Sequence, residues 1–279
     1  MTRLQRIWMR PGRVIETLLI LVTLGVVLFP IYWMMQMSLK WRLEQFALPP
    51  KYLFAPSLAN YRELLDGDFL AAFWNSTVVA LWTTAISLLA GVPAAYGLSR
   101  LHARALSARI QFLVLAVRMA PAIVFALPFF LIFRYLNLID TKLGLVIVYL
   151  TFNLPLVIWM LGPYFDAVPR EIEEASVVDG ARPWQTFLLV LPLVMPGLVA
   201  AGINAFLFAW NEFFFALVLT RSRATTGPIA IVNFLNYESG FEWGKITAGG
   251  TLVMLPMILF AITVRKYLVR GIAAGAVKG

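Results

Sequence analysis

Residues 170–185 read REIEEASVVDGARPWQ, and this stretch carries four carboxylates within its first ten residues. Pro169, just before it, suits the first turn of a helix, and the glutamates that follow complement the positive end of the helix dipole. Gly180 can adopt a positive φ where the helix ends, and Pro183 prevents the helix from continuing. The stretch therefore predicts a short helix within 171–181, a stop and a restart.

This predicted helix is too short to be stable in water by itself. Ala175, Val177 and Val178 give it a small apolar face beside its carboxylates. A short helix with an exposed apolar face is suited to the groove of a partner protein. We therefore expect the segment to be a docking element.

The chain on either side of this helix is strongly apolar. Of its 279 residues, 61% are hydrophobic and 13% are charged, whereas a soluble domain has about 25% charged residues. Apolar runs of the ~20 residues that cross a bilayer recur along the chain. Prolines lie within most of these runs, and each can break a helix. The pattern predicts an all-α integral membrane protein with six transmembrane helices, at 15–38, 70–97, 110–134, 143–165, 186–219 and 246–268.

The lysines and arginines predict the orientation of these spans. An even number of spans places both termini on one side of the membrane. The segments on that side hold thirteen Lys and Arg residues and the opposite loops hold nine. Because cytoplasmic segments are enriched in positive charge, we expect both termini and the acidic segment to be cytoplasmic.

The chain is expected to form a single transmembrane domain over 1–279, with two long connections. The first, at about 39–69, carries equal numbers of acidic and basic residues, three prolines and several aromatic residues. It is interpreted as a folded extracytoplasmic cap, with a disordered linker as the alternative. The second, at about 166–185, is the cytoplasmic loop that contains the docking helix.

Two charged residues fall deep within predicted spans, away from the ends where the other charges lie. Arg118 lies in the third and Glu212 in the fifth. A charge at bilayer depth is costly, so such residues face a bundle interior, a cavity or a partner. The two residues therefore either form structural pairs or line a translocation path.

Amides and aromatic rings lie at similar depth. Amide groups beside aromatic faces suit a sugar, whose hydroxyls need hydrogen bonds and whose C–H faces stack on rings. Amides also join helices to one another within a membrane, so both readings stay open. The candidate residues for a substrate pathway are Arg118, Asn153, Asn204, Trp210, Asn211 and Glu212.

Several function classes are excluded by what the sequence lacks. It has no cysteine and one histidine, so disulfides, thiolate metal sites and multi-histidine metal sites are excluded. It has no phosphate-binding G-x-x-x-x-G-K-[ST] loop and no recognisable enzyme motif. We expect neither catalytic residues nor a metal or cofactor bound by this chain. An ion-coupled carrier or passive channel that uses Arg118 and Glu212 is the alternative function.

The segment EEASVVDGA followed by LPLVMP resembles the EAA loop of binding-protein-dependent ABC importers. The resemblance extends along the chain through ANY, NST, AYGLSR, LPLVIWML, WNEFFFAL and GIAAGAVKG. More closely, the chain resembles the second permease of the carbohydrate uptake class that includes the maltose system. This resemblance implies the type I ABC importer permease fold, a single permease domain over 1–279 and a place in a bacterial inner membrane.

The resemblance also implies roles for individual residues. In the family, the short helix of the EAA loop is called the coupling helix. It lies in a cleft of the ATP-hydrolysing subunit, where its glutamate contacts a basic residue. One departure is that Leu191-Pro192 follows Gly180 one residue earlier than the family pattern has it. The residues implied in coupling are Glu173, Glu174, Ala175 and Ser176 around the E-A-A triplet, and Asp179, Gly180 and Ala181 in the D-G-A that follows.

The partners implied by the resemblance are a homologous second permease, two ATPase subunits that bind ATP and Mg²⁺, and an extracytoplasmic solute-binding protein. The implied solute is a carbohydrate or a carbohydrate-like compound such as an oligosaccharide, a polyol or a glycerol phosphoester. No nucleic acid partner is expected, because the basic residues lie mostly at the ends of apolar runs.

Overall fold

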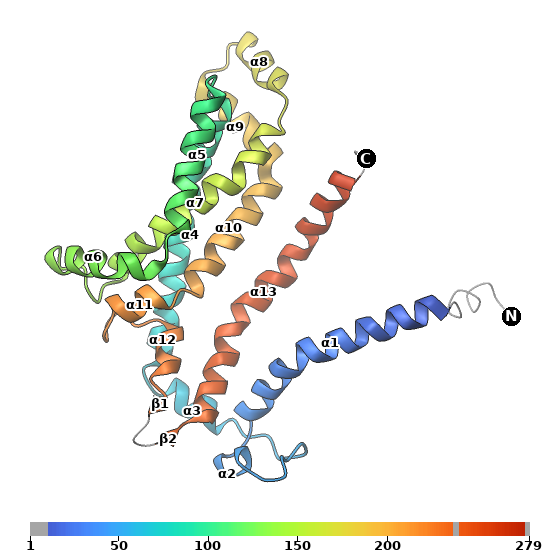
Figure 1. Cartoon of the computed structure of the whole chain (residues 1–279), viewed down its shortest axis with the longest axis vertical. Helices are drawn as coiled ribbons and strands as arrows, with labels where there is room; N and C mark the ends of the chain where they lie inside the picture. The colour runs from blue at the N-terminus through green and yellow to red at the C-terminus, as the bar shows by residue number, and fades with distance from the viewer. Residues whose placement is uncertain (1–10, 237–239, 277–279) are drawn as a thin grey trace. The chain divides into compact units, whose positions relative to one another are not determined.

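The computed structural model describes residues 11–236 and 240–276. The basic residues at positions 3, 6, 10 and 278, which contribute to the predicted orientation, lie outside this range. Within it the chain is almost entirely helical (Figure 1). The helices are α1 (Pro11–Ser38), α2 (Arg42–Gln45), α3 (Ala59–Leu65), α4 (Phe69–Arg100), α5 (Arg104–Met119), α6 (Ala122–Tyr135), α7 (Lys142–Asp166), α8 (Arg170–Val178), α9 (Pro183–Val190), α10 (Met195–Trp210), α11 (Phe214–Leu219), α12 (Gly227–Val232) and α13 (Trp243–Ala276). A 3₁₀ turn, Leu191–Val194, joins α9 to α10, and the two-residue strands β1 (Leu235–Asn236) and β2 (Gly240–Phe241) pair antiparallel.

The predicted all-helical membrane fold is confirmed. Among the described residues, five helices are long and apolar enough to cross a bilayer, and a sixth span is formed if α5 and α6 are counted together. The span predicted at 110–134 is not one straight helix, because α5 and α6 meet at 86°. Pro121 lacks an amide hydrogen and disfavours helical geometry in the residue before it, and Ala120 is accordingly extended, with ψ of 135°.

The span predicted at 186–219 is also interrupted. The structure ends α10 at Trp210, and α11 begins at Phe214. Leu191-Pro192 falls in the 3₁₀ turn between α9 and α10, where the tighter geometry changes the helical register. The described part of this region is therefore a long span followed by a separate short helix.

The chain divides into two compact units, and the first combines the described residues up to Gly67 with Ile231–Leu252. The amide of Asn60 donates to the carbonyl oxygens of Ser38 and Lys40, at 2.8 and 2.9 Å. The ammonium group of Lys245, near the start of α13, lies 3.4 Å from Glu63 and 3.1 Å from Glu242. These contacts give the 39–69 connection a defined structure around α2 and α3.

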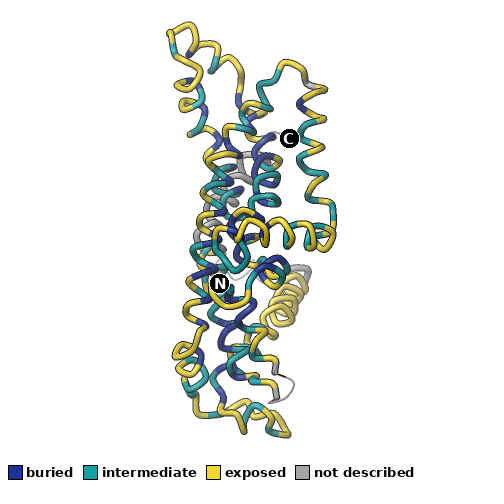
Figure 2. Tube along the Cα trace, turned by 90° about the vertical axis from the view of Figure 1, so that its left-hand side faces the viewer, coloured by how far each residue is buried: buried dark blue, intermediate teal, exposed yellow. Residues whose placement is uncertain are grey.

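The second unit contains Asp68–Ala230 and the described residues from Val253 onward. Its centre is formed by α4, α7 and α10, which pack side by side (Figure 1). Gly91 allows the close approach of α4 and α7, since a Cβ atom there would lie 2.7 Å from Cγ1 of Val157. Buried residues are concentrated where these three helices face one another, and exposed residues lie mainly on their outward faces (Figure 2). Outward apolar surface of this kind is what a bilayer requires.

One carboxylate organises the loop between α11 and α12. Asp140, in the turn before α7, accepts hydrogen bonds from four consecutive backbone amides, those of residues 221–224, at 3.0 to 3.2 Å. The amide of Asn75 donates to the carbonyl oxygens of Arg223 and Thr225. The start of α4 and the turn before α7 therefore fix this loop from two sides.

Candidate functional site

The acidic segment folds as its sequence predicted. Helix α8 spans Arg170–Val178, and Gly180 follows with φ of +83°. The amide of Ala181 donates to the carbonyl oxygen of Ser176 at 2.9 Å, and the amide of Gly180 donates to that of Val177 at 3.0 Å. This pair of bonds is a Schellman motif, in which glycine takes the left-handed position. The next helix, α9, begins at Pro183.

Helix α8 has two faces of different character. Ser176 is buried and Glu173 is half-buried, so both lie against the body of the protein. Glu174 and Ala175 are exposed, as are Asp179 and Gly180 in the turn. Two large apolar side chains on the outer face are also exposed, Val177 at 62% and Val178 at 86%.

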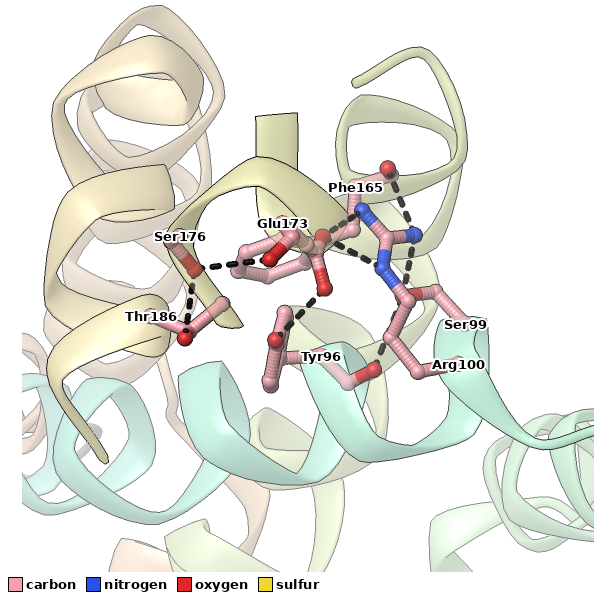
Figure 3. A network of polar contacts seen from close by, with 7 residues as sticks. All are labelled: Tyr96, Ser99, Arg100, Phe165, Glu173, Ser176 and Thr186. Carbon is pink, nitrogen blue, oxygen red and sulfur yellow. Dashed lines mark hydrogen bonds and ion pairs between the residues drawn. The ribbon is translucent and has the colours of Figure 1, made fainter. Parts of the chain in front are cut away.

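The inner face of α8 is held by an ion pair (Figure 3). Nη2 of Arg100, the last residue of α4, lies 2.5 Å from Oε1 of Glu173, and Nε of Arg100 donates to the same oxygen at 2.6 Å. The hydroxyl of Tyr96 donates to the other carboxylate oxygen at 2.8 Å. Nη1 of Arg100 also donates to the carbonyl oxygen of Phe165 at 3.0 Å. The side chains of Arg100 and Glu173 are only 16% and 14% exposed. Solvent ions therefore screen the attraction between their charges only weakly.

Further contacts bring α7 and α9 into the same group. The hydroxyl of Ser176 donates to the carbonyl oxygen of Glu173 at 2.7 Å and lies 2.8 Å from the hydroxyl of Thr186 on α9. The ring of Tyr96 packs on those of Phe165 and Phe187, with centroids 5.5 and 5.2 Å apart. We call Tyr96, Arg100, Phe165, Glu173, Ser176 and Thr186 the α8 anchor, because these residues join α8 to the ends of α4, α7 and α9 (Figure 3).

The second candidate site is a partly open cavity of about 250 Å³, bordered by α5, α6, α7, α10 and α11. It brings together three of the residues that the sequence singled out, Arg118 on α5, Asn153 on α7 and Glu212 after α10. The remaining lining residues are Ala120, Ala122, Tyr149, Phe152, Phe208, Ala209 and Phe215. Charged, amide and aromatic groups therefore surround one space.

The polar groups of this cavity differ in how well they are satisfied. The carboxylate of Glu212 accepts hydrogen bonds from the amides of Phe215 and Ala216, at 2.9 and 3.1 Å, and so caps α11. The guanidinium of Arg118 lies 4.2 Å from the centroid of the Phe208 ring, a cation–π contact.

Two buried polar atoms at the cavity are unsatisfied within the described part of the chain. Asn153 and Tyr149 are 3% and 2% exposed, and neither Oδ1 of the amide nor the tyrosine hydroxyl completes a hydrogen bond there. The hydroxyl of Tyr149 lies close to the Glu212 carboxylate without the geometry of a bond. Buried polar atoms that face a cavity fit water or a hydroxylated ligand.

The other three pathway candidates lie outside the lining of this cavity. The amide of Asn204 donates to the carbonyl oxygen of Ala200, and that of Asn211 donates to Leu207, so both bond within α10. The indole of Trp210 is buried and donates to the carbonyl oxygen of Val253 at 3.0 Å. Of these three side chains, Trp210 alone bonds to another helix, and the two amides bond to the preceding turn of the chain.

Several residues of these sites were not predicted from the sequence, and three of them carry polar groups on α4 or α7. Tyr149 lies four residues before Asn153 and therefore on the same face of α7, which is a signal that could have revealed it. Tyr96 and Arg100 also lie four residues apart, at the end of a predicted span. Their partner Glu173 is 73 residues away from Arg100, and no local pattern indicates that pairing.

Residues 87–274 match the family described as the binding-protein-dependent transport system inner membrane component. The trehalose transport system permease protein SugB of Mycobacterium tuberculosis is 38% identical, over 95% of this chain and 96% of that protein. The trehalose/maltose transport system permease protein MalG of Thermococcus litoralis is 32% identical, over 91% and 92% of the two chains. A crystal structure of a bacterial ABC transporter that imports alginate matches with a TM-score of 0.74 at 23% identity, over 96% and 98%.

Proposed function

The chain belongs to the family of binding-protein-dependent transport system inner membrane components, and from this premise we propose that it lines half of a solute pathway and couples that pathway to ATP-hydrolysing partners. It is a multi-pass permease subunit of an ABC importer. Hydrolysis of ATP would occur on the partner subunits, which bind ATP and Mg²⁺. This chain would supply the membrane path and the docking helix.

The exposed face of α8 carries this proposal. Glu174 and Ala175 are exposed beside Val177 and Val178, on a helix too short to be stable alone. An apolar surface flanked by a carboxylate suits a partner groove that offers a basic residue and an apolar floor. A passive channel or ion-coupled carrier has no use for such a helix.

Three kinds of partner complete the proposed assembly. They are a homologous permease that supplies the other half of the pathway, two ATPase subunits that receive α8 and its counterpart, and an extracytoplasmic protein that delivers the solute. The excess of Lys and Arg on one side of the predicted spans supports a cytoplasmic position for α8 and both termini. Closure of the ATPase pair would move α8 and switch the core from inward-facing to outward-facing.

The proposed solute is a carbohydrate or a similar polyhydroxylated compound. The relatives named for trehalose and for trehalose/maltose transport support this class. The cavity supports it as well, because the unsatisfied groups of Tyr149 and Asn153 lie beside the rings of Phe152, Phe208 and Phe215. Hydroxyl groups and apolar C–H faces of a sugar would satisfy these two kinds of surface.

ATP hydrolysis by the co-purified complex in liposomes tests the function. The cognate solute-binding protein is added with single sugars, polyols or glycerol phosphoesters. Stimulation by one class supports the importer and identifies the solute. An ATPase that co-purifies but is stimulated by none of them would overturn the carbohydrate assignment, and an active chain with no ATPase subunit would favour the carrier.

A further inference from the structure

The two covalent connections of α8 are poorly suited to transmit movement. On one side a turn of three residues, 167–169, separates it from α7. On the other side Gly180 takes a positive φ, and nothing within 4 Å would restrict an added Cβ atom there. Backbone hydrogen bonds close this turn, but no side chain packs against Gly180. Side-chain contacts are therefore needed to hold α8 against the membrane helices.

The α8 anchor supplies those contacts, and they converge on Glu173. Arg100 donates to one oxygen of its carboxylate and Tyr96 to the other. Both donors belong to the last turns of α4, a helix of 32 residues that packs against α7 and α10 in the core. The same guanidinium reaches the carbonyl oxygen of Phe165 at the end of α7. The carboxylate of Glu173 thus joins α8 to α4 directly, and Arg100 extends the link to α7.

We propose that Arg100 and Tyr96 are positioning residues that hold α8 to α4 through Glu173, so that movement of α8 reaches the membrane core as one rigid displacement. This inference rests on the proposed docking role of α8. It gives the adjacent glutamates different tasks. Glu174 faces outward toward the ATPase subunit, whereas Glu173 faces inward and transmits the movement. Loss of Glu173 would uncouple the importer, whereas loss of Glu174 would weaken docking.

Charge reversal tests the proposal in the full complex. Arg100→Glu and Glu173→Arg are made singly and together, and solute uptake and ATP hydrolysis are measured on the same proteoliposomes. Each single variant places like charges together and is expected to lower the solute transported per ATP at least tenfold. The double variant is expected to recover most of this ratio. Normal ratios in both single variants would overturn the proposal.

Two further variants separate transmission from a loss of folding. Tyr96→Phe removes only one hydroxyl and is expected to lower the ratio severalfold while the ATPase subunit still co-purifies. Arg109→Glu reverses an exposed charge on α5 and is the matched control. It is expected to leave the ratio unchanged, and a fall equal to that of Arg100→Glu would count against a specific role for the anchor.

A covalent substitute for the ion pair gives an independent outcome. Because this chain has no cysteine, Arg100→Cys with Glu173→Cys introduces its only two thiols. The reduced double variant is expected to be uncoupled, and a short bifunctional thiol reagent is expected to restore coupling. No recovery with the reagent, together with none on charge reversal, would overturn the proposal. Absence of any ATPase subunit with the unmodified chain would instead overturn the proposed function.

Discussion

Glu173 and Glu174 are neighbours in the chain, but one side chain is held against the body of the protein and the other is exposed. The carboxylate of Glu173 accepts hydrogen bonds from Tyr96 and Arg100 at the end of α4, whereas Glu174 is exposed. Successive helical positions are separated by about 100°, so one residue of the acidic pair is turned inward while the next is turned to the surface. The same difference predicts separate effects of substitution at the two positions.

We predict that Glu174→Lys abolishes solute-stimulated ATP hydrolysis. The exposed lysine would repel the basic residue expected in the partner groove, and it would leave the inner contacts of α8 intact. The measurement is stimulated hydrolysis by the complex in liposomes, with Arg109→Glu as the control for a reversed surface charge. Normal stimulation in the Glu174 variant would contradict the docking role of the outer face.

Gly180 gives a prediction about backbone geometry. Its φ of +83° costs an L-residue about 1–2 kcal/mol, so Gly180→Ala is expected to weaken stimulated hydrolysis. Gly180→Pro is expected to abolish it, because proline requires φ near −65° and removes the hydrogen bond to Val177. Gly97→Ala is the control, since Gly97 is helical and has nothing within 4 Å of an added Cβ atom. Equal losses in the two alanine variants would exclude the turn as the cause.

Local signals explain what could be predicted from the sequence. Pro169, Gly180 and Pro183 act within a few residues of themselves, and they placed α8 and its turn correctly. The membrane fold followed from long apolar runs, which need no knowledge of packing. Proline gave a weaker signal, because Pro121 separates α5 from α6 whereas Pro128 lies inside α6.

The orientation of each helix about its own axis determines which residues face the cavity, and the sequence does not reveal that orientation. Asn153 and Asn204 share chemistry and predicted depth, yet only Asn153 faces the cavity. The break after Trp210 also lacks a Gly or Pro from which it could have been predicted. There the carboxylate of Glu212 bonds to the amides of α11 and stabilises a new helix start.

Asp140 predicts how stability depends on pH. Burial raises the pKa of this carboxyl, but four backbone amide hydrogen bonds outweigh burial and hold the pKa well below its usual range. A carboxyl with a depressed pKa in the folded state stabilises the protein at pH values above its unfolded pKa of about 3.9, and this contribution is lost as pH falls toward the folded value.

Asp140→Asn is therefore expected to lower the melting temperature at pH 7. The loss corresponds to about 1–2 kcal/mol, a figure reduced because the carboxylate is partly exposed. The difference from the unmodified chain should stay constant down to about pH 4 and shrink below it. Thermal unfolding across pH measures this, and Asp66→Asn at an exposed position is the control. A difference that grows below pH 4 would contradict the assigned hydrogen bonds.

Asn153 and Asn204 form a matched pair for testing the cavity. Asn153→Leu is expected to reduce solute uptake at least tenfold, because it removes a buried amide and places an apolar group in the space beside Tyr149 and Glu212. Asn204→Leu removes only a bond to the preceding turn of its own helix and is expected to change uptake less than threefold. Uptake in proteoliposomes at equal amounts of complex measures both. If Asn204→Leu lost uptake while Asn153→Leu kept it, the solute would not pass through this cavity.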